Sequence, residues 1–345
     1  MVQQSDLSRK GLVATMFTEQ ILRENPGMIK AFMGIPSEVF WMIVQVVERV
    51  LPDLDQQRLE RSDRQRARGA GRPCDQPVVI RVAAVLTYVR LYAPQIPVAL
   101  MYGMTQPDLS RDLRRIVPAL HRALPCPEVW QVLENGQELS DTDRLALADL
   151  AQHRVLVDAT EQRTSRPSDN DTRKAYYSGK KKQFTLKTQF VVDGEHHIHA
   201  ISESVPGAEH DKTLSDELQT LEHLPDHCEV EADKGYQGLD KQVRLVTVID
   251  PETQRPQEVA RLTVQTPYKK PKGGELTDAQ RTFNASLNAI RVRVEHCLGW
   301  AKNWAILAIR FRCAHTIYTS VMRAICGLVN LQTQRWQATK AANSA

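Results

Sequence analysis

The 345-residue sequence contains no run of 18 consecutive apolar residues, so a conventional transmembrane helix is not expected. Its first 17 residues, MVQQSDLSRKGLVATMF, also lack the apolar segment behind a basic start that marks an export signal. We therefore expect a cytoplasmic protein with no membrane partner. With 42% hydrophobic and 25% charged residues, the chain is long enough to form two domains with buried cores.

Metal-ligand spacings are also absent from the cysteines and histidines. The six cysteines, at positions 74, 126, 228, 297, 313 and 326, form no CxxC motif. Reduced and mostly buried thiols are therefore expected, with neither disulfides nor a zinc site. The segment EHHIHA holds three histidines, but on a strand only His197 and His199 would share a face. We expect a surface hairpin there.

The net charge of +4 says little, but its distribution along the chain says more. Residues 56–73 carry six arginines against two acids, and residues 171–190 carry six lysines or arginines against one aspartate. Residues 203–240 hold eleven acids against two lysines. This arrangement favours a protein that grips a polyanion through basic segments and holds divalent cations at a carboxylate-rich place. For any single segment, a solvated surface is the alternative.

Two parts with different periodicity follow one another along the chain. Apolar residues at helical spacing predict helices over 36–52 and 77–93, and helices dominate up to about residue 150. From there to residue 335, short β-branched or alternating runs predict the order strand, strand, strand, helix, strand. We therefore expect a helical region, 1–150, followed by a mixed-sheet domain, 151–335, in an α+β or α/β fold.

This order of elements brings two carboxylates together. Three antiparallel strands followed by a crossover helix return the fourth strand parallel to the first. Asp158 and Asp233 follow the apolar residues of those two strands, so they should lie a few ångströms apart. Such a pair needs a shared proton or a metal ion, and Mg²⁺ fits carboxylates beside phosphate oxygens. The alternative is that each aspartate only forms a turn.

A third carboxylate is expected from a helix that begins after residue 276. Thr277 and Gln280 form a capping box, and Glu295 lies at the edge of the apolar stripe that follows. If this helix packs on the sheet, it would direct Glu295 to the metal and Arg291 to DNA. The alternative is a surface ion pair between Arg291 and Glu295.

Residues 96–123 predict a helix-turn-helix. A short helix ends near Gly103, and a second begins at Thr105 with Pro107 and Asp108 in its first turn. The alternative is a helical hairpin used for packing or dimerisation. In a helix-turn-helix the second helix would present these side chains to the major groove: Gln106, Ser110, Arg111, Arg114 and Arg115.

Six blocks between about residues 150 and 330 carry a resemblance to a known family. They are VDAT, YYSGKKKQFTLK, PGAEHDKTL, EADKGYQG, TPYKKPKGGELT and RVRVEHCLGWAK. In this order they resemble bacterial insertion-sequence transposases of the IS5 type, relatives of the eukaryotic Harbinger elements. Residues 72–123 resemble the helix-turn-helix segment that precedes the catalytic domain in that family.

The resemblance implies an RNase H-like domain with a DDE triad. Carried over to this sequence, the triad is Asp158, Asp233 and Glu295, which would hold two Mg²⁺ ions, with Mn²⁺ as a substitute. His210 and Asp211 would support the site. Asp211 also precedes the crossover helix, where an aspartate most often caps the first turn.

The implied partner is double-stranded DNA, namely the terminal inverted repeats of the element and the target DNA. A homodimer or larger assembly would bind it in the bacterial cytoplasm, in association with the nucleoid. Basic groups outside the helix-turn-helix would hold phosphates without reading bases. These groups are Lys180, Lys181, Lys182, Lys187, Lys269, Lys270, Lys272 and Arg291.

Three functions are compatible with these features. A transposase would cleave and join DNA strands at one site. A transposase-derived DNA-binding protein would not cut, and a plain metal-dependent nuclease would not transfer strands. The intact carboxylates favour catalysis, and the separate DNA-reading region favours the transposase.

Overall fold

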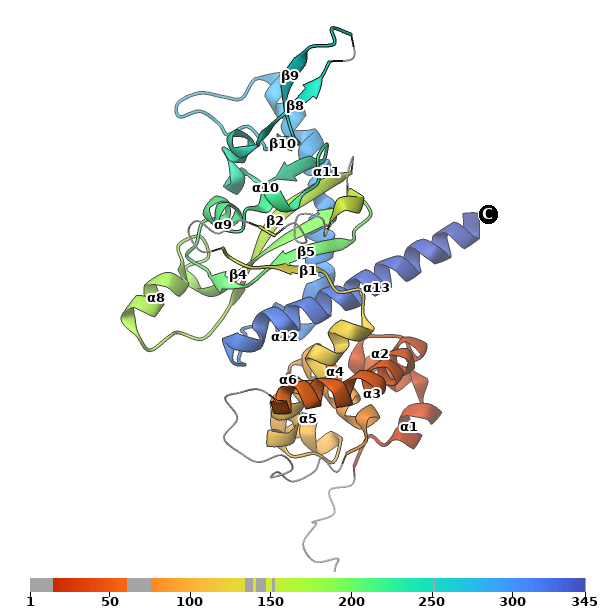
Figure 1. The fold of residues 1–345 in the computed structure, drawn as a ribbon. Helices are drawn as coiled ribbons and strands as arrows, with labels where there is room; N and C mark the ends of the chain where they lie inside the picture. The colour runs from red at the N-terminus through yellow and green to blue at the C-terminus, as the bar shows by residue number, and fades with distance from the viewer. Residues whose placement is uncertain are drawn as a thin grey trace, which may run out of the picture. The chain divides into compact units, whose positions relative to one another are not determined.

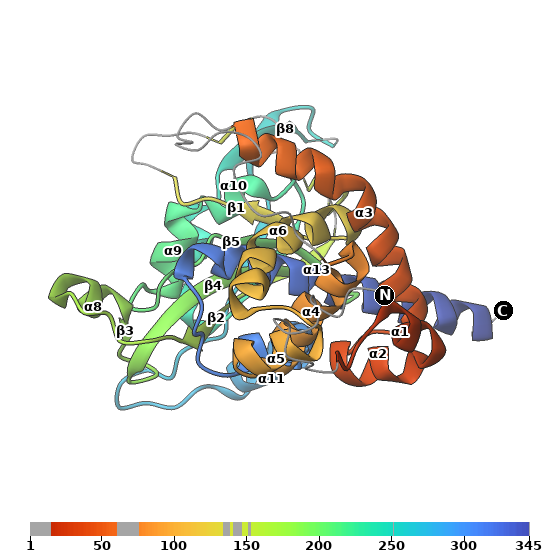
Figure 2. The same ribbon diagram turned by 90° about the horizontal axis from the view of Figure 1, so that it is seen from below.

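Helices make up the first of two compact units, which comprises Met1–Leu124 and Trp304–Ile306 (Figures 1 and 2). The computed structural model describes residues 15–60, 76–133, 139–140, 147–150, 153–250 and 252–344. Cys74 and most of the predicted arginine-rich segment lie outside these ranges. The helices are α1 (Glu19–Glu24), α2 (Pro26–Met33), α3 (Ser37–Glu60), α4 (Val78–Leu91), α5 (Gln95–Met101) and α6 (Gln106–Ala123).

The helices predicted over 36–52 and 77–93 are confirmed as α3 and α4. Residues 79–89 of α4 are all buried, so this helix forms the centre of the unit. Arg81 of α4 makes a buried ion pair with Asp112 of α6, with 2.7 Å between the charged groups. None of the described helices alone is long and apolar enough to cross a membrane, although α2 and α3 pass that test as a pair bent by 80°.

Helices α5 and α6 meet at the predicted turn. Gly103 adopts a left-handed conformation with φ of 63°, which glycine accepts at little cost. Thr105 caps α6: its hydroxyl accepts from the backbone N–H of Asp108, and the Asp108 side chain accepts from the backbone N–H of Thr105. This reciprocal cap explains why α6 begins where the sequence predicted.

The second unit, Pro125–Asn303 with Leu307–Ala345, contains the main sheet. The domain boundary predicted near residue 150 falls inside this unit, because β1 (Glu128–Trp130) already pairs with the sheet. The strand order is β1-β5-β4-β2-β7-β10, and the short strands β3 (Tyr177–Ser178) and β6 (Val205–Pro206) also pair with β4. The remaining strands are β2 (Arg154–Arg163), β4 (Gln183–Asp193), β5 (Ile198–Ser202), β7 (Glu229–Ala232) and β10 (Thr263–Gln265).

The directions of the strands agree with the predicted topology. Strands β2, β4 and β5 are antiparallel neighbours, and β7 returns parallel to β2 on its other side. Strand β10 lies parallel to β7 at the far edge. The sheet is therefore mixed, and its central strands are β4, β2 and β7.

Helices pack on both faces of this sheet. On one face, the crossover segment forms two short helices, α9 (Asp211–Glu217) and α10 (Thr220–His223), where the sequence predicted one. Gln219 separates them in a left-handed conformation with φ of 50°. Leucines 214, 218, 221 and 224 of this segment are buried against the sheet, as their spacing predicted. On the other face, α11 (Asp278–Lys302) contacts β2, β4 and β7, and α13 (Tyr318–Ser344) contacts β5.

The connection between β7 and α11 contains three strands. Strands β8 (Leu245–Ile249) and β9 (Pro256–Ala260) form a separate antiparallel hairpin next to β10, which rejoins the main sheet (Figure 1). The smaller elements of this unit are α8 (Asn170–Tyr176), η1 (Ala148–Leu150), η2 (Lys234–Tyr236), η3 (Leu239–Gln242) and η4 (His315–Ile317), and the short helix α12 (Ala305–Ala308) is divided between the two units.

Candidate active site

Asp158 and Asp233 lie side by side on adjacent parallel strands. Val157 of β2 pairs in register with Ala232 of β7, so the next residues along the two strands are these aspartates. Asp233 directly follows β7 and precedes the short helix η2. The Asp158 side chain is 17% exposed and that of Asp233 is 32% exposed. The strand order alone therefore brings two half-buried carboxylates together.

The guanidinium of Arg291, on α11, lies between the two carboxylates. Its Nη1 is 3.0 Å from Oδ1 of Asp233, and its Nη2 is 3.5 Å from Oδ2 of Asp158. Arg291 is a buried residue, whereas the sequence predicted that it would contact DNA phosphates. The predicted DNA contact of Arg291 is wrong because Arg291 belongs to the buried stripe of α11 with Leu287 and Val294. Its side chain therefore faces the sheet.

Glu295 does not join the two aspartates in this structure. It lies on α11 one turn beyond Arg291, and its side chain is exposed. Among the described residues, no three His, Cys, Asp or Glu side chains are grouped closely enough to hold a metal ion. Of the predicted triad, the structure therefore brings together only Asp158 and Asp233, with the guanidinium of Arg291 between them.

The electrostatics of the pair suit an additional cation. The pKa of Asp158 is raised to about 6, mainly by burial and also by the neighbouring carboxylates Asp233 and Asp211. The backbone N–H of Ala159, which donates to Asp158 at 2.8 Å, and the charge of Arg291 oppose this rise only in part. Two hard oxygen ligands that one guanidinium does not fully neutralise fit a divalent ion such as Mg²⁺.

Asp211 also belongs to this neighbourhood, but not as a helix cap. The N-cap of α9 is His210, which makes no side-chain capping bond and is exposed, and Asp211 is the first helical residue. Asp211 accepts a hydrogen bond of 2.7 Å from the ammonium of Lys187. The capping interpretation of Asp211 is therefore wrong.

Lys187 is not a surface phosphate contact, in contrast to its predicted role. It lies on β4, a central strand, and is 5% exposed. Its ammonium pairs with Asp211 and lies 3.9 Å from Glu161 on β2. A side chain covered on both sides by the sheet and α9 cannot reach a DNA backbone, so the basic segment that contains it is only partly available for DNA.

The other predicted lysines of that segment are exposed. Lys180, Lys181 and Lys182 lie in the turn between β3 and β4. The pKa of Lys302, at the end of α11, is lowered by burial and by repulsion from Lys181, and Asp158 counteracts this. Lys181 and Lys302 therefore place positive charge close to the aspartate pair. The sequence places Lys302 seven residues beyond Glu295 on the same flank of α11, where it was expected to face DNA.

A second exposed basic segment lies in the loop between β10 and α11. Lys269, Lys270 and Lys272 are all exposed there, as their predicted role requires. Lys270 is engaged in an ion pair with Glu275. The positively charged surface of this unit thus includes the β3–β4 turn and this loop.

In the first unit, α6 presents its predicted basic residues outward to different degrees. Arg111 is exposed but pairs with Asp108, three residues earlier. Arg114 is exposed, and Arg115 is half-buried with its Nε 3.7 Å from Asp55 of α3. Arg114 is therefore the member of this set that is best placed for a base contact.

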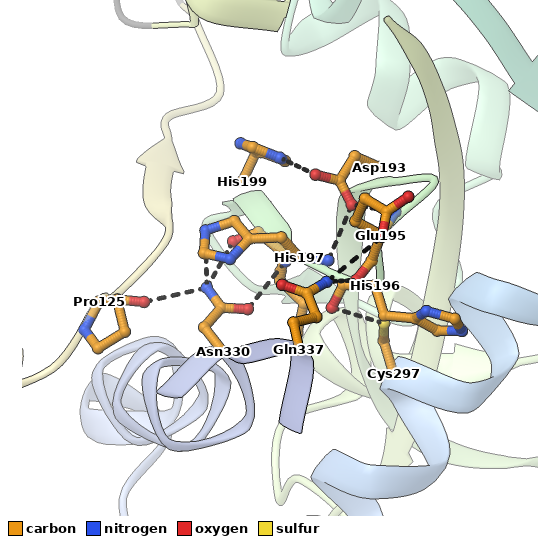
Figure 3. A network of polar contacts seen from close by, with 10 residues as sticks. Pro125, Asp193, Glu195, His196, His197, His199, Cys297, Asn330 and Gln337 are labelled. Carbon is orange, nitrogen blue, oxygen red and sulfur yellow. Dashed lines mark hydrogen bonds and ion pairs between the residues drawn. The ribbon is translucent and has the colours of Figure 1, made fainter. Parts of the chain in front are cut away.

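The histidine-rich segment forms the predicted hairpin, between β4 and β5, and packs against helix α13 (Figure 3). His199 pairs with Asp193 at 2.8 Å. Asn330 of α13 bonds both the backbone N–H and the carbonyl of Ile198, and its amide also lies beside His197. These contacts join the helix to the hairpin. The five described cysteines are free, as expected.

Two half-buried carboxylates on neighbouring strands, with lysines close by, suit a metal-dependent nuclease. Residues 157–330, half of the chain, match the family model described as DDE superfamily endonuclease. The chain belongs to this family, whose endonuclease domains use divalent metal ions. It is 25% identical over 309 residues to a protein of Microchaete diplosiphon named probable transposase for insertion sequence element IS702, covering 88% of this chain and 93% of that protein. A comparison with solved structures finds no match.

Proposed function

We propose that this protein is a DNA transposase that cleaves and joins strands at the ends of its own insertion sequence. The observation that carries the proposal is the pairing of Asp158 with Asp233 inside a matching endonuclease domain. The name of the Microchaete diplosiphon relative, which aligns over most of both chains, supports transposition over simple cutting. The resemblance to the IS5 type is part of the proposal.

The order of strands in the second unit supports an RNase H-like catalytic domain, residues 151–335. Asp158 and Asp233 would hold the metal, with Glu295 as the third carboxylate. Bound Mg²⁺, as two ions replaceable by Mn²⁺, would activate a water or a 3′-hydroxyl and stabilise the leaving oxygen. Arg291 keeps the aspartates together and Lys181 and Lys302 add positive charge where a phosphate would approach.

The helical unit, whose main segment ends at Leu124, would recognise the DNA. Helix α6 follows a short turn after α5 and exposes Arg114, as a recognition helix of a helix-turn-helix does. The DNA partners would be the terminal inverted repeats and the target, held by a homodimer or larger assembly. A separate DNA-reading region distinguishes a transposase from a plain nuclease.

To test this directly, the protein is incubated with Mg²⁺ and DNA that carries the native element ends, and the products are sequenced. A transposase yields ends joined to new DNA. Cleavage at many sites without joining would instead support a metal-dependent nuclease. Binding without cleavage would support a transposase-derived DNA-binding protein.

The turn between β3 and β4 provides a test of phosphate binding. Replacing Lys180, Lys181 and Lys182 by alanine should weaken binding to all DNA sequences alike. The slope of log affinity against log salt should flatten by up to about 0.9 for each lost phosphate contact. A titration over several salt concentrations measures this, with Lys241→Ala, an exposed lysine of η3, as the control. An unchanged slope would show that the turn is only a solvated surface.

Helix α6 provides a test of base reading. Arg114→Ala should cost about 1 to 3 kcal/mol in binding to the element ends and little in binding to scrambled DNA. Arg111→Ala should show a smaller effect, because Asp108 already engages its guanidinium. Competition binding at fixed salt measures both, with the exposed Arg122 of the same helix replaced as the control. An equal loss for every sequence would move base reading to another element.

A further inference from the structure

We infer that Asp211, held in place by Lys187, is a positioning residue for Asp233. It would fix the turn after β7 from the face of the sheet opposite Arg291. This inference rests on the proposed function, since it concerns the metal site of that function. It assigns Asp211 a role distinct from helix capping and from metal ligation.

The first observation is a buried chain of charges beneath the site. Lys187 lies 2.7 Å from Asp211 and 3.9 Å from Glu161, and the three side chains are 6%, 16% and 6% exposed, respectively. Lys187 and Glu161 are directly opposite each other in the register of β4 and β2. Thr185 also donates to Glu161 at 2.8 Å. Asp211 is therefore anchored to the two central strands of the sheet.

The second observation is the close approach of Asp211 to the turn that carries Asp233. A Cβ atom added to Gly235 would lie 2.6 Å from Oδ2 of Asp211, a distance that real side chains do not reach. A side chain at position 235 would therefore push the Asp211 carboxylate out of its present place. The next residue, Tyr236, is fully buried and donates to Gln189 of β4 at 3.3 Å. The turn is thus held at two consecutive residues.

The third observation is electrostatic. Burial is the main cause that raises the pKa of Tyr236, and the nearby charges of Asp158, Asp211 and Asp233 raise it as well. They do not form a metal-binding group of three within the described residues. Asp211 is paired with its own lysine, which leaves Asp158 and Asp233 for a metal ion.

A merely structural ion pair and a positioning pair differ in how they respond to a double substitution. Removing one partner of a buried pair leaves an uncompensated charge, whereas removing both restores much of the stability. Loss of the carboxylate that packs against Gly235 is not repaired in this way. In the double variant, stability should therefore be restored in part while metal affinity stays low.

The experiment measures Mn²⁺ binding to the full chain by electron paramagnetic resonance, without DNA, together with the Tm. Asp211→Asn and Lys187→Met should each weaken Mn²⁺ binding about tenfold or more, the usual effect of losing a residue that orients a ligand. The double variant should recover part of the lost Tm, since Glu161 keeps only Thr185 as a partner, but it should not recover Mn²⁺ affinity. Gly235→Ala, which leaves every charge in place, should also weaken Mn²⁺ binding. Asp112→Asn, which breaks the buried pair with Arg81 in the other unit, should lower Tm alone.

Two results would overturn the inference: Mn²⁺ affinity of Asp211→Asn within twofold of the wild type, or full recovery of affinity in the double variant. If Asp211→Asn does not fold, the charge-balanced double variant and Gly235→Ala decide the question by the same criterion. A wild-type protein that binds Mn²⁺ but neither cuts nor joins DNA would refute the proposed function and leave this inference standing. A wild-type protein without a Mn²⁺ site would overturn both.

Discussion

Replacing Asp233 by asparagine is expected to abolish Mg²⁺-dependent DNA cleavage while leaving the fold and DNA binding almost unchanged. The amide keeps the shape of the side chain but loses the charge that a divalent cation requires. The loss should reach about 4 kcal/mol of transition-state stabilisation, or about a thousandfold in rate. Arg291 would still pair with Asp158, so the packing of α11 on the sheet should survive.

The measurement compares cleavage rates with the Tm and with DNA affinity in competition binding. Asp240→Asn is the matched control, because Asp240 lies seven residues further along the chain and is exposed. It should leave all three quantities unchanged. Cleavage by Asp233→Asn within tenfold of the wild-type rate would remove Asp233 from the proposed active site.

The pairing of Asp158 with Asp233 was predictable because it follows from the order of elements. A crossover from the third strand has to return on the far side of the first strand, and β7 does lie parallel to β2. The starts of two helices were predictable for a local reason. Thr277 with Gln280, and the region of Thr105, combine side chains that satisfy their own first turn, and both caps are present.

The orientation of α11 was not predictable to the accuracy that the site requires. Arg291 and Glu295 are four residues apart, so they lie on nearly the same flank of the helix. A small rotation decides which of them faces the sheet, and packing of Leu287 and Val294 determines that rotation. The sequence contains both candidates but not the packing that selects between them.

The burial of Lys187 could not be predicted from the sequence, for a different reason. In the segment KKQFTLKTQF it looks like one more lysine of a solvated basic segment. Its partner Asp211 is 24 residues away in sequence, and the contact exists only because α9 packs against β4. The break at Gln219 between α9 and α10 likewise has no local signal, since a non-glycine residue takes up a left-handed conformation there.

The pH dependence of stability should reveal the energetic cost of Asp158 in the metal-free protein. Its pKa is about 6 in the folded chain against an ordinary value of 3.8, mainly because of burial. Between about pH 4 and pH 6 the folded state therefore binds more protons than the unfolded state at this group. The free energy of unfolding must then fall as pH rises through this window, and the cost is complete above pH 6 or so.

Asp158→Asn should remove this cost, because asparagine resembles the protonated carboxyl. A difference of about two pKa units corresponds to about 3 kcal/mol, so at pH 7.5 the variant should be more stable than the wild type by up to that amount. The gain should shrink towards zero near pH 4, and the variant should not cleave DNA. Denaturant unfolding between pH 4 and pH 8 with EDTA present measures the effect, and Asp240→Asn should show no pH-dependent difference. If the variant is less stable than the wild type at pH 7.5, or if their difference in unfolding free energy does not depend on pH, then ionised Asp158 does not destabilise the metal-free fold.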